Sequence, residues 1–273
     1  MRRAAPAKPG LARARWLRSG ILEVCAARRV VSDRRSLWRL FRLRVLPFTW
    51  RGRNAAAVPL RIRALTDREI WIRPRTADIH SVLDVFHFGH NESPKGLERE
   101  APLVIYDLGA NVGLTMVHLA ELFPRASIVG VELQAENISQ ARRNLAHLRD
   151  RCRLVPAAIW PDDGVVSYHA ERGDEQSARA AGRGELDTDV PALSISTLMR
   201  RQGHLRVDYV KMDIEGAERE VLSRNTDWAS SVGSIRVEVH DPYTPEACMR
   251  DLRRLSFRVE AASDLRSAVV GER

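Results

Sequence analysis

The chain has 273 residues, which is enough for one α/β domain of about 200 residues and an appendage. No stretch of 18 uncharged apolar residues occurs, so the sequence predicts no membrane-spanning helix. The three cysteines, Cys25, Cys152 and Cys248, are widely separated and lack metal-binding spacing. Their odd number and their spacing indicate a reducing, cytoplasmic compartment rather than a disulfide framework.

The positive charge of the chain is concentrated at its N-terminus. The net charge is +9, but residues 1–63 hold 17 Lys or Arg against only Glu23 and Asp33, a balance of +15. Residues 64–273 therefore carry 9 − 15 = −6. We expect a basic arm over residues 1–63, partly disordered or amphipathic-helical, followed by a folded domain over residues 64–273.

Within the arm, residues 34–48 place Leu and Phe among Arg in an approximate helical pattern with one cationic face. Such a helix predicts peripheral contact with a membrane surface or with an acidic partner. Other interpretations account for the same composition: a solvated leader, a start codon placed too far upstream, or an organellar transit peptide. The composition alone does not decide among them.

A short strand and a helix follow the arm. Residues 69–72 form the predicted strand, and residues 76–78 supply the cap of a helix that runs to about residue 88. The apolar run 102–106 then predicts a buried strand, and the periodic stretch 112–123 predicts a helix. Between these two elements lies the glycine-rich turn DLGANVG, residues 107–113.

This turn indicates a nucleotide-like cofactor. Gly109 and Gly113 let the backbone turn tightly and bring a ligand close to the unpaired N–H groups at the start of the helix. A dinucleotide site also needs glycine at the second and third positions of G-x-G-x-x-G, which here are Asn111 and Leu114. S-adenosylmethionine has no phosphates and tolerates the bulkier turn, and its ammonium and sulfonium groups favour the carboxylate of Asp107. We therefore expect S-adenosylmethionine as the cofactor.

A second predicted strand, residues 127–132, ends in the carboxylate of Glu132, 19 residues after Gly113. A carboxylate at that place accepts hydrogen bonds from both ribose hydroxyls of a nucleoside. An acid at a strand end is also often a solvated residue or a helix cap. The preceding glycine turn favours the ribose interpretation.

The rest of the chain alternates strands and helices. The predicted elements are helix 136–148, strands 153–158 and 165–169, strand 207–212, helix 215–223, strand 234–240, helix 245–255 and a closing pair at 257–260 and 267–270. Residues 171–190 show no periodicity, which predicts a mobile loop. Such loops often determine which substrate an enzyme binds. This order implies a largely parallel sheet covered on both faces, with ligands at the carboxyl ends of its strands.

Two further strand ends are unusually polar. Asp213 follows the strand at 207–212, and Glu215 and Glu218 come next, where acids in a first helical turn stabilise the helix dipole without any catalytic duty. Glu238 and His240 alternate at the end of the strand 234–240 and share one side of it. A histidine at this edge is a candidate general base, although core and surface histidines are more common.

Two chemistries are compatible with these residues. In the first, His240, with an ordinary pKa of about 6.5, takes a proton while Glu238 or Asp213 orients it. In the second, Asp213, Glu238 and Asp241 gather a Mg²⁺-type cation, because hard metals prefer oxygen ligands. We prefer the first, since the acids after the strand at 207–212 are already explained by helix capping.

The motifs together resemble the FkbM family of S-adenosylmethionine-dependent methyltransferases. The similar segments are DLGANVG at 107–113, VELQAEN at 131–137, AAIW at 157–160, ISTL at 195–198, VDYVKMDIEGAE at 207–218 and VEVH at 237–240. The resemblance implies a Rossmann-like class I methyltransferase fold, with a seven-stranded, mostly parallel sheet, one antiparallel strand and helices on both faces. It also implies methylation of hydroxyl groups on sugars, glycans or polyketide natural products.

The resemblance assigns roles by position. Asp107, Gly109, Asn111 and Gly113 would line the methionine end of the cofactor, Glu132 the ribose, and Ala158 the adenine through backbone and apolar contact. The expected acceptor is a small molecule or a glycan, and the sequence does not predict the oligomeric state.

Two other classes of protein are compatible with parts of the sequence. A nucleic-acid base methyltransferase, suggested by the basic arm, would need an Asp/Asn-Pro-Pro-aromatic motif after the strand at 207–212, where this chain has DIEG. We therefore expect no specific nucleic-acid substrate. A non-catalytic module that keeps the fold and binds S-adenosylmethionine would differ from an enzyme in cofactor turnover, because Asp213 and His240 would then be dispensable.

Overall fold

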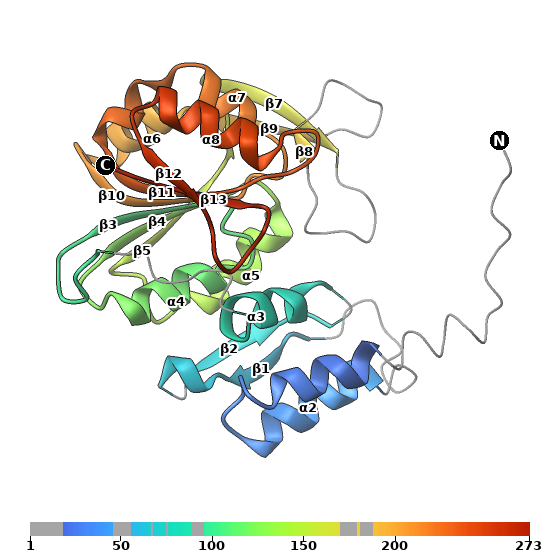
Figure 1. Ribbon diagram of the computed structural model, residues 1–273. Coiled ribbons are helices and arrows are strands. Elements are labelled where there is room, and N and C mark those ends of the chain that lie inside the picture. Colours follow the sequence, from blue (N-terminus) through green and yellow to red (C-terminus); the bar gives the residue numbers. More distant parts are fainter. Residues whose placement is uncertain are drawn as a thin grey trace, which may run out of the picture. The chain divides into compact units, whose positions relative to one another are not determined.

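The computed structural model describes residues 19–45, 56–66, 68–74, 76–88, 96–169, 179–180 and 188–273. The chain divides into two compact units, Met1–Phe88 and Gly89–Arg273, shown from blue to cyan and from green to red in Figure 1. No helix in the described ranges is long and apolar enough to cross a membrane. All three cysteines are free, with Cys25 exposed and the other two buried.

The first unit combines helices with a two-stranded antiparallel sheet. Its elements are α2 (Arg34–Val45), β1 (Val58–Arg61), the 3-10 helix η2 (Arg63–Leu65), β2 (Glu69–Ile72) and α3 (Asp78–Phe86). In the sheet, Val58 pairs with Ile72 and Arg61 with Glu69. The boundary predicted after residue 63 falls between these two paired strands. The helix predicted at 34–48 is present as α2, and residues 46–48 lie outside the described ranges.

The start of α2 is determined by a side-chain cap. Asp33 Oδ1 accepts hydrogen bonds from the backbone N–H groups of Arg35, at 2.7 Å, and Ser36, at 2.9 Å. Ser36 Oγ in turn accepts a bond from the backbone N–H of Arg61 at 2.9 Å. Capping therefore orders the first turn of α2, and Ser36 ties that turn to β1.

Asp33→Ala should destabilise α2 by about 1 to 2 kcal/mol, because two N–H groups of its first turn lose their acceptor. Hydrogen–deuterium exchange of α2 in the full chain measures this effect, and we expect roughly tenfold faster exchange. Asp33→Asn is the matched control, since asparagine caps about as well as aspartate. Equal protection in the alanine variant and the wild type would show that this cap does not limit opening of the helix.

The second unit is built on a seven-stranded sheet in the order β12-β13-β11-β10-β3-β4-β5. Its strands are β3 (Val104–Leu108), β4 (Ser127–Glu132), β5 (Cys152–Pro156), β10 (Val207–Met212), β11 (Val232–Glu238), β12 (Arg258–Ala261) and β13 (Ala268–Glu272). Neighbouring strands from β5 to β11 pair in parallel, whereas β13 is antiparallel to both β11 and β12. The predicted mostly parallel sheet with one antiparallel strand is confirmed.

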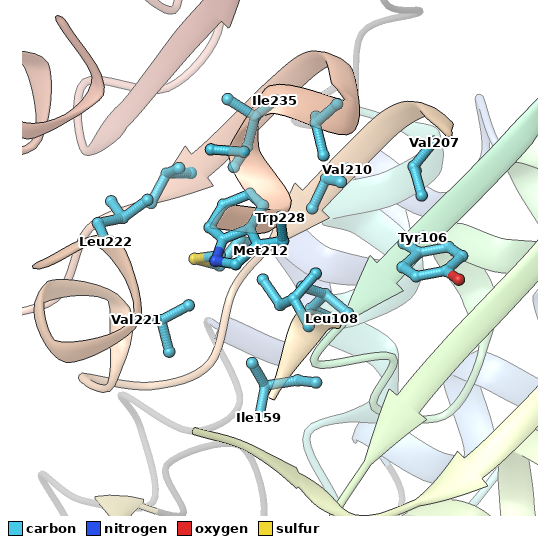
Figure 2. Packing of buried hydrophobic residues seen from close by; sticks show 14 of the residues in the cluster. Tyr106, Leu108, Ile159, Val207, Val210, Met212, Val221, Leu222, Trp228 and Ile235 are labelled. Atoms are coloured by element: carbon cyan, nitrogen blue, oxygen red, sulfur yellow. The ribbon is translucent and has the colours of Figure 1, made fainter. Parts of the chain in front are cut away.

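Helices cover both faces of this sheet (Figure 1). On one face lie α4 (Leu114–Leu122) and α5 (Ala135–Asn144); on the other lie α6 (Ile195–Gln202), α7 (Glu218–Ser223) and α8 (Pro245–Arg254), with the 3-10 helix η3 (Thr226–Ser231) following α7. Figure 2 shows the core between the sheet and the second group, where Met212 and Ile235 of the sheet pack near Trp228 and Leu222. α6 was not predicted, although Ser194 caps it by accepting a bond from the Thr197 N–H.

A second, four-stranded sheet has the order β6-β9-β7-β8. Its strands are β6 (Ala158–Ile159), β7 (Gly164–His169), β8 (Arg179–Ala180) and β9 (Thr188–Leu193). The strand predicted at 153–158 is therefore two elements in different sheets. The predicted loop 171–190 is wrong at 179–180, which form β8, and at 188–190, which begin β9. Residues 171–178 and 181–187 lie outside the described ranges. The segment lacks a strand periodicity, and Pro191 in β9 further weakens the strand pattern.

Candidate active site

The glycine turn joins β3 to α4 in a conformation that its sequence favours. Gly109, Asn111 and Gly113 have φ values of +87°, +48° and +78°, in the left-handed region that glycine adopts readily. A Cβ atom on Gly109 would lie 1.7 Å from the backbone oxygen of Asp213. Only glycine fits at this position, because the end of β10 passes directly against the turn.

Glu132 connects this turn to the end of β4. Its carboxylate accepts a hydrogen bond from the Asn111 N–H at 2.9 Å and another from the Gln134 N–H at 2.8 Å. Burial raises the pKa of Glu132, and these backbone donors oppose that rise. The Leu133 backbone and the Asn137 side chain also bond this carboxylate. A ribose hydroxyl would therefore share the carboxylate oxygens with these four protein donors.

The turn, Glu132 and the end of β10 surround one cavity of about 600 Å³, counting the space at its mouth. The predicted residues Gly109, Asn111, Glu132, Ala158 and Asp213 line it. The lining residues that were not predicted are Val131, Leu133, Gln134, Asn137, Ala157, Ile159, Ile214, Glu215 and Ala217.

The other predicted cofactor residues, Asp107 and Gly113, lie behind the cavity wall. A Cβ on Gly113 would lie 3.2 Å from the Ala141 side chain, so this glycine allows α4 to approach α5 closely. Asp107 is fully buried, and neither of its carboxylate oxygens has a hydrogen-bond partner in the described part of the chain. Burial raises the pKa of Asp107 to about 6, against the opposing charge of Lys211.

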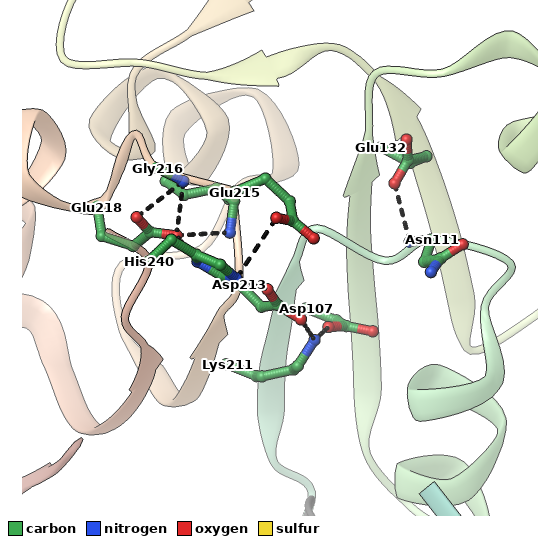
Figure 3. Close-up of polar contacts among 10 residues, drawn as sticks. Asp107, Asn111, Glu132, Lys211, Asp213, Glu215, Gly216, Glu218 and His240 are labelled. Atoms are coloured by element: carbon green, nitrogen blue, oxygen red, sulfur yellow. Dashed lines mark hydrogen bonds and ion pairs between the residues drawn. The ribbon is translucent and has the colours of Figure 1, made fainter. Parts of the chain in front are cut away.

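Lys211 lies between two carboxylates, as Figure 3 shows. Its Nζ atom is 3.6 Å from Asp107 Oδ1 and 3.1 Å from Asp213 Oδ2. The side chain is buried, but the two carboxylates outweigh the effect of burial and raise the pKa of Lys211. Lys211 therefore pairs with Asp213, which lines the cavity.

His240 and Glu218 form a hydrogen-bonded pair beside Asp213. Glu218 is fully buried; it accepts bonds from the N–H groups of Ile214 and Gly216 and lies 3.0 Å from His240 Nδ1. The opposite ring nitrogen, Nε2, is 3.7 Å from Asp213 Oδ1 and 3.4 Å from Glu215 Oε2 (Figure 3). The sequence did not predict the contact with Glu218, because the two residues are 22 positions apart.

Two local predictions at this cluster are wrong. β11 ends at Glu238, so His240 lies two residues beyond the strand and not within it. α7 begins at Glu218, and Glu215 precedes it with a left-handed φ of +54°. Helix capping therefore does not account for Glu215, which instead lines the cavity.

The crowding of acids changes the titration of the whole cluster. Burial lowers the pKa of His240, but the bond to Glu218 and the charges of Glu218, Glu215 and Asp213 raise it to about 9. Burial and the charge of Asp213 raise the pKa values of Glu215 and Glu238 to about 7. His240 therefore does not keep the ordinary pKa that the sequence interpretation assumed.

A cation-binding geometry is also present, but with different residues from those predicted. Asp213, Glu215 and His240 each offer one ligand atom, and the three atoms lie within 4.8 Å of one another. The predicted set of Asp213, Glu238 and Asp241 is not brought together in this way among the described residues. Carboxylate oxygens with one imidazole nitrogen suit a divalent metal ion, so chelation has to be tested alongside the acid–base chemistry.

Comparison with known proteins identifies the family. The family model of the methyltransferase FkbM domain matches residues 107–264, which span the glycine turn, Glu132 and His240. The chain belongs to the FkbM methyltransferase family. As a member of that family it is an S-adenosylmethionine-dependent methyltransferase. The family match therefore supports an enzyme over a non-catalytic module that only binds the cofactor. The cavity, the glycine turn and the carboxylate of Glu132 in the cavity wall fit a cofactor that carries a ribose.

Relatives of this FkbM-family methyltransferase include two named O-methyltransferases. The 2-O-methyltransferase NoeI of Sinorhizobium fredii is 25% identical and aligns with 56% of this chain and 69% of its own length. The 31-O-demethyl-FK506 methyltransferase FkbM of Streptomyces tacrolimicus is 23% identical, over 54% of this chain and 68% of its own. A solved structure, that of methyltransferase FkbM from Methylobacillus flagellatus, has 12% sequence identity to this chain and superposes with a TM-score of 0.47. The alignment covers 93% of this chain and 59% of the Methylobacillus chain.

Proposed function

We propose that the protein transfers the methyl group of S-adenosylmethionine to a hydroxyl group of a sugar, a glycan or a natural product. The contact between His240 and Glu218, next to the cavity residue Asp213, is the observation that carries this proposal. Oxygen methylation requires a base for the hydroxyl proton, and this pair supplies one. The names of the two O-methyltransferase relatives support the choice of oxygen as the acceptor atom.

The cavity residues hold the cofactor in this proposal. Glu132 accepts hydrogen bonds from the ribose hydroxyls, while Gly109 and Asn111 let the ligand approach the turn closely. Ala158 provides an apolar surface for the adenine, and Asp107 supplies negative charge behind the turn. When bound, S-adenosylmethionine supplies a methyl group on a positively charged sulfur atom. The excess of carboxylates around the cavity complements that charge.

His240 removes the acceptor proton at its Nε2 atom. Glu218, bonded to Nδ1, holds the imidazole ring in one orientation and stabilises the imidazolium that forms, while Asp213 adds negative charge on the Nε2 side. Glu218 thus takes the orienting role that sequence interpretation gave to Asp213 or Glu238. Positioning of the acceptor oxygen in line with the methyl donor contributes further acceleration.

The acceptor class is tested with isotope-labelled S-adenosylmethionine and panels of monosaccharides, oligosaccharides and hydroxylated natural products. We expect label in an O-methyl ether, identified by mass spectrometry, in at least one of these panels. RNA and DNA serve as competing acceptors in the same assay. Label transferred to a nucleic-acid base, with none in the hydroxyl panels, would contradict the proposal.

A further inference from the structure

The face of α2 that points away from β1 combines aromatic rings with arginines. Trp38 is 56% exposed, and its ring stacks on that of Phe41 with centroids 5.5 Å apart and planes inclined by 17°. Arg34 and Arg42 are exposed one turn before and one turn after Trp38, on the same side of the helix. Arg35, next to Arg34, is exposed as well. A helix on the surface of a soluble domain usually presents polar groups alone on this side.

The opposite face of α2 is held against β1, so the aromatic face cannot turn inward. Leu40 is fully buried, and Arg39 Nη1 donates a hydrogen bond to the Pro59 carbonyl at 2.9 Å. Ser36 is also buried and bonded to the backbone of Arg61. The exposure of Trp38 is therefore a consequence of how the first unit folds.

Exposed apolar residues are concentrated in this unit. Of six large apolar side chains that are exposed in the described ranges, four lie within Met1–Phe88: Ile21, Leu22, Trp38 and Phe88. α2 itself contains five arginines and no acidic residue. A surface that combines exposed apolar side chains with arginines and no acidic residue typically binds a partner that is both apolar and anionic.

We propose that the exposed face of α2, formed by Arg34, Arg35, Trp38 and Arg42 with the half-buried Phe41 stacked on Trp38, docks the protein on an anionic membrane surface. Arginines pair with lipid phosphates, and tryptophan and phenylalanine enter the boundary between headgroups and acyl chains. The electrostatic attraction of the arginines and the insertion of the aromatic rings are each weak. Stable peripheral membrane binding requires two such contributions together.

A single-stranded nucleic acid also binds arginines and aromatic rings, but the geometry favours a membrane. The Trp38 and Phe41 rings cover one face of each other, whereas a nucleobase needs a free ring face for stacking.

Flotation of the full chain with lipid vesicles tests the proposal. We expect binding to vesicles of phosphatidylcholine mixed with phosphatidylglycerol, little binding to phosphatidylcholine alone, and weaker binding at high salt. The double variant Arg34→Glu with Arg35→Glu should weaken binding by about 30-fold or more. Trp38→Ser should weaken it by roughly tenfold, because the variant loses the apolar contribution.

Matched controls come from exposed positions of the second unit. Arg253→Glu with Arg254→Glu makes the same change of charge, and Leu205→Ser removes an apolar side chain that is 93% exposed. Both controls should bind vesicles like the wild type, and unchanged circular dichroism should show that every variant folds. Equal binding to both vesicle types, or undiminished binding by the Arg34 and Arg35 variant, would overturn the proposal. Tighter binding of a single-stranded RNA oligonucleotide, lost in the same variants, would assign the face to nucleic acid instead.

Discussion

Replacing His240 by alanine should reduce turnover by about 10²–10⁴-fold while leaving the affinity for S-adenosylmethionine unchanged. The imidazole lies beside the cavity and is not among its lining residues, so its loss affects proton removal and not cofactor binding. Turnover is measured by methyl transfer and cofactor affinity by calorimetry. His204→Ala is the matched control, because that histidine is bonded to the Tyr106 hydroxyl and does not line the cavity.

The pH profile separates a base from a merely structural histidine. A general base acts when it is deprotonated, so activity should rise with pH and level off near the raised pKa of His240, about 9. Glu218→Gln keeps an acceptor for Nδ1 but removes a negative charge, and should move the rising limb toward lower pH. Near-normal turnover in the His240 variant would reject it as the base.

Chelation decides between the base and a cation at the same cluster. Under the proposed mechanism, activity survives a chelator and does not depend on added Mg²⁺. Loss of activity in the chelator and its return with Mg²⁺ would instead make Asp213, Glu215 and His240 metal ligands.

Glu132→Ala should weaken S-adenosylmethionine binding by about 3 kcal/mol, roughly a hundredfold in Kd. Two hydrogen bonds from ribose hydroxyls to a charged acceptor account for a loss of this size. The variant also leaves the N–H groups of Asn111 and Gln134 without their acceptor, so part of the effect is a looser glycine turn.

Calorimetry measures the affinity, and thermal unfolding shows whether the Glu132 variant remains folded. Glu136→Ala is the matched control, because Glu136 is an exposed acid in the first turn of α5. Glu132→Gln should fall between the alanine variant and the wild type, since it keeps an acceptor but loses the charge. An unchanged Kd in a folded Glu132→Ala variant would remove this residue from the cofactor site.

Two strands of the parallel sheet were predicted most accurately from sequence, whereas the strands predicted at 102–106 and 234–240 are displaced by two residues from β3 and β11. The predicted bounds of β4 and β10 agree with the structure residue for residue. β4 is mostly apolar, whereas β10 also contains Asp208 and Lys211. β1 and β9 were missed. Each contains a proline, at Pro59 and Pro191, which in sequence indicates a turn or an edge.

The sequence by itself determined the α/β class, the glycine turn and the acid at the end of β4, because strand periodicity, glycine dihedral preference and residue spacing are local properties. Only the tertiary structure decided which polar groups meet. Glu218 reaches His240 because β10 and β11 are neighbours in the sheet, and the same proximity of carboxylates raises the pKa of the histidine. Glu215 likewise faces the cavity because the backbone turns left-handed before α7, where sequence alone favours a helical cap. Packing between segments distant in the chain sets these contacts and charges, and no local pattern encodes them.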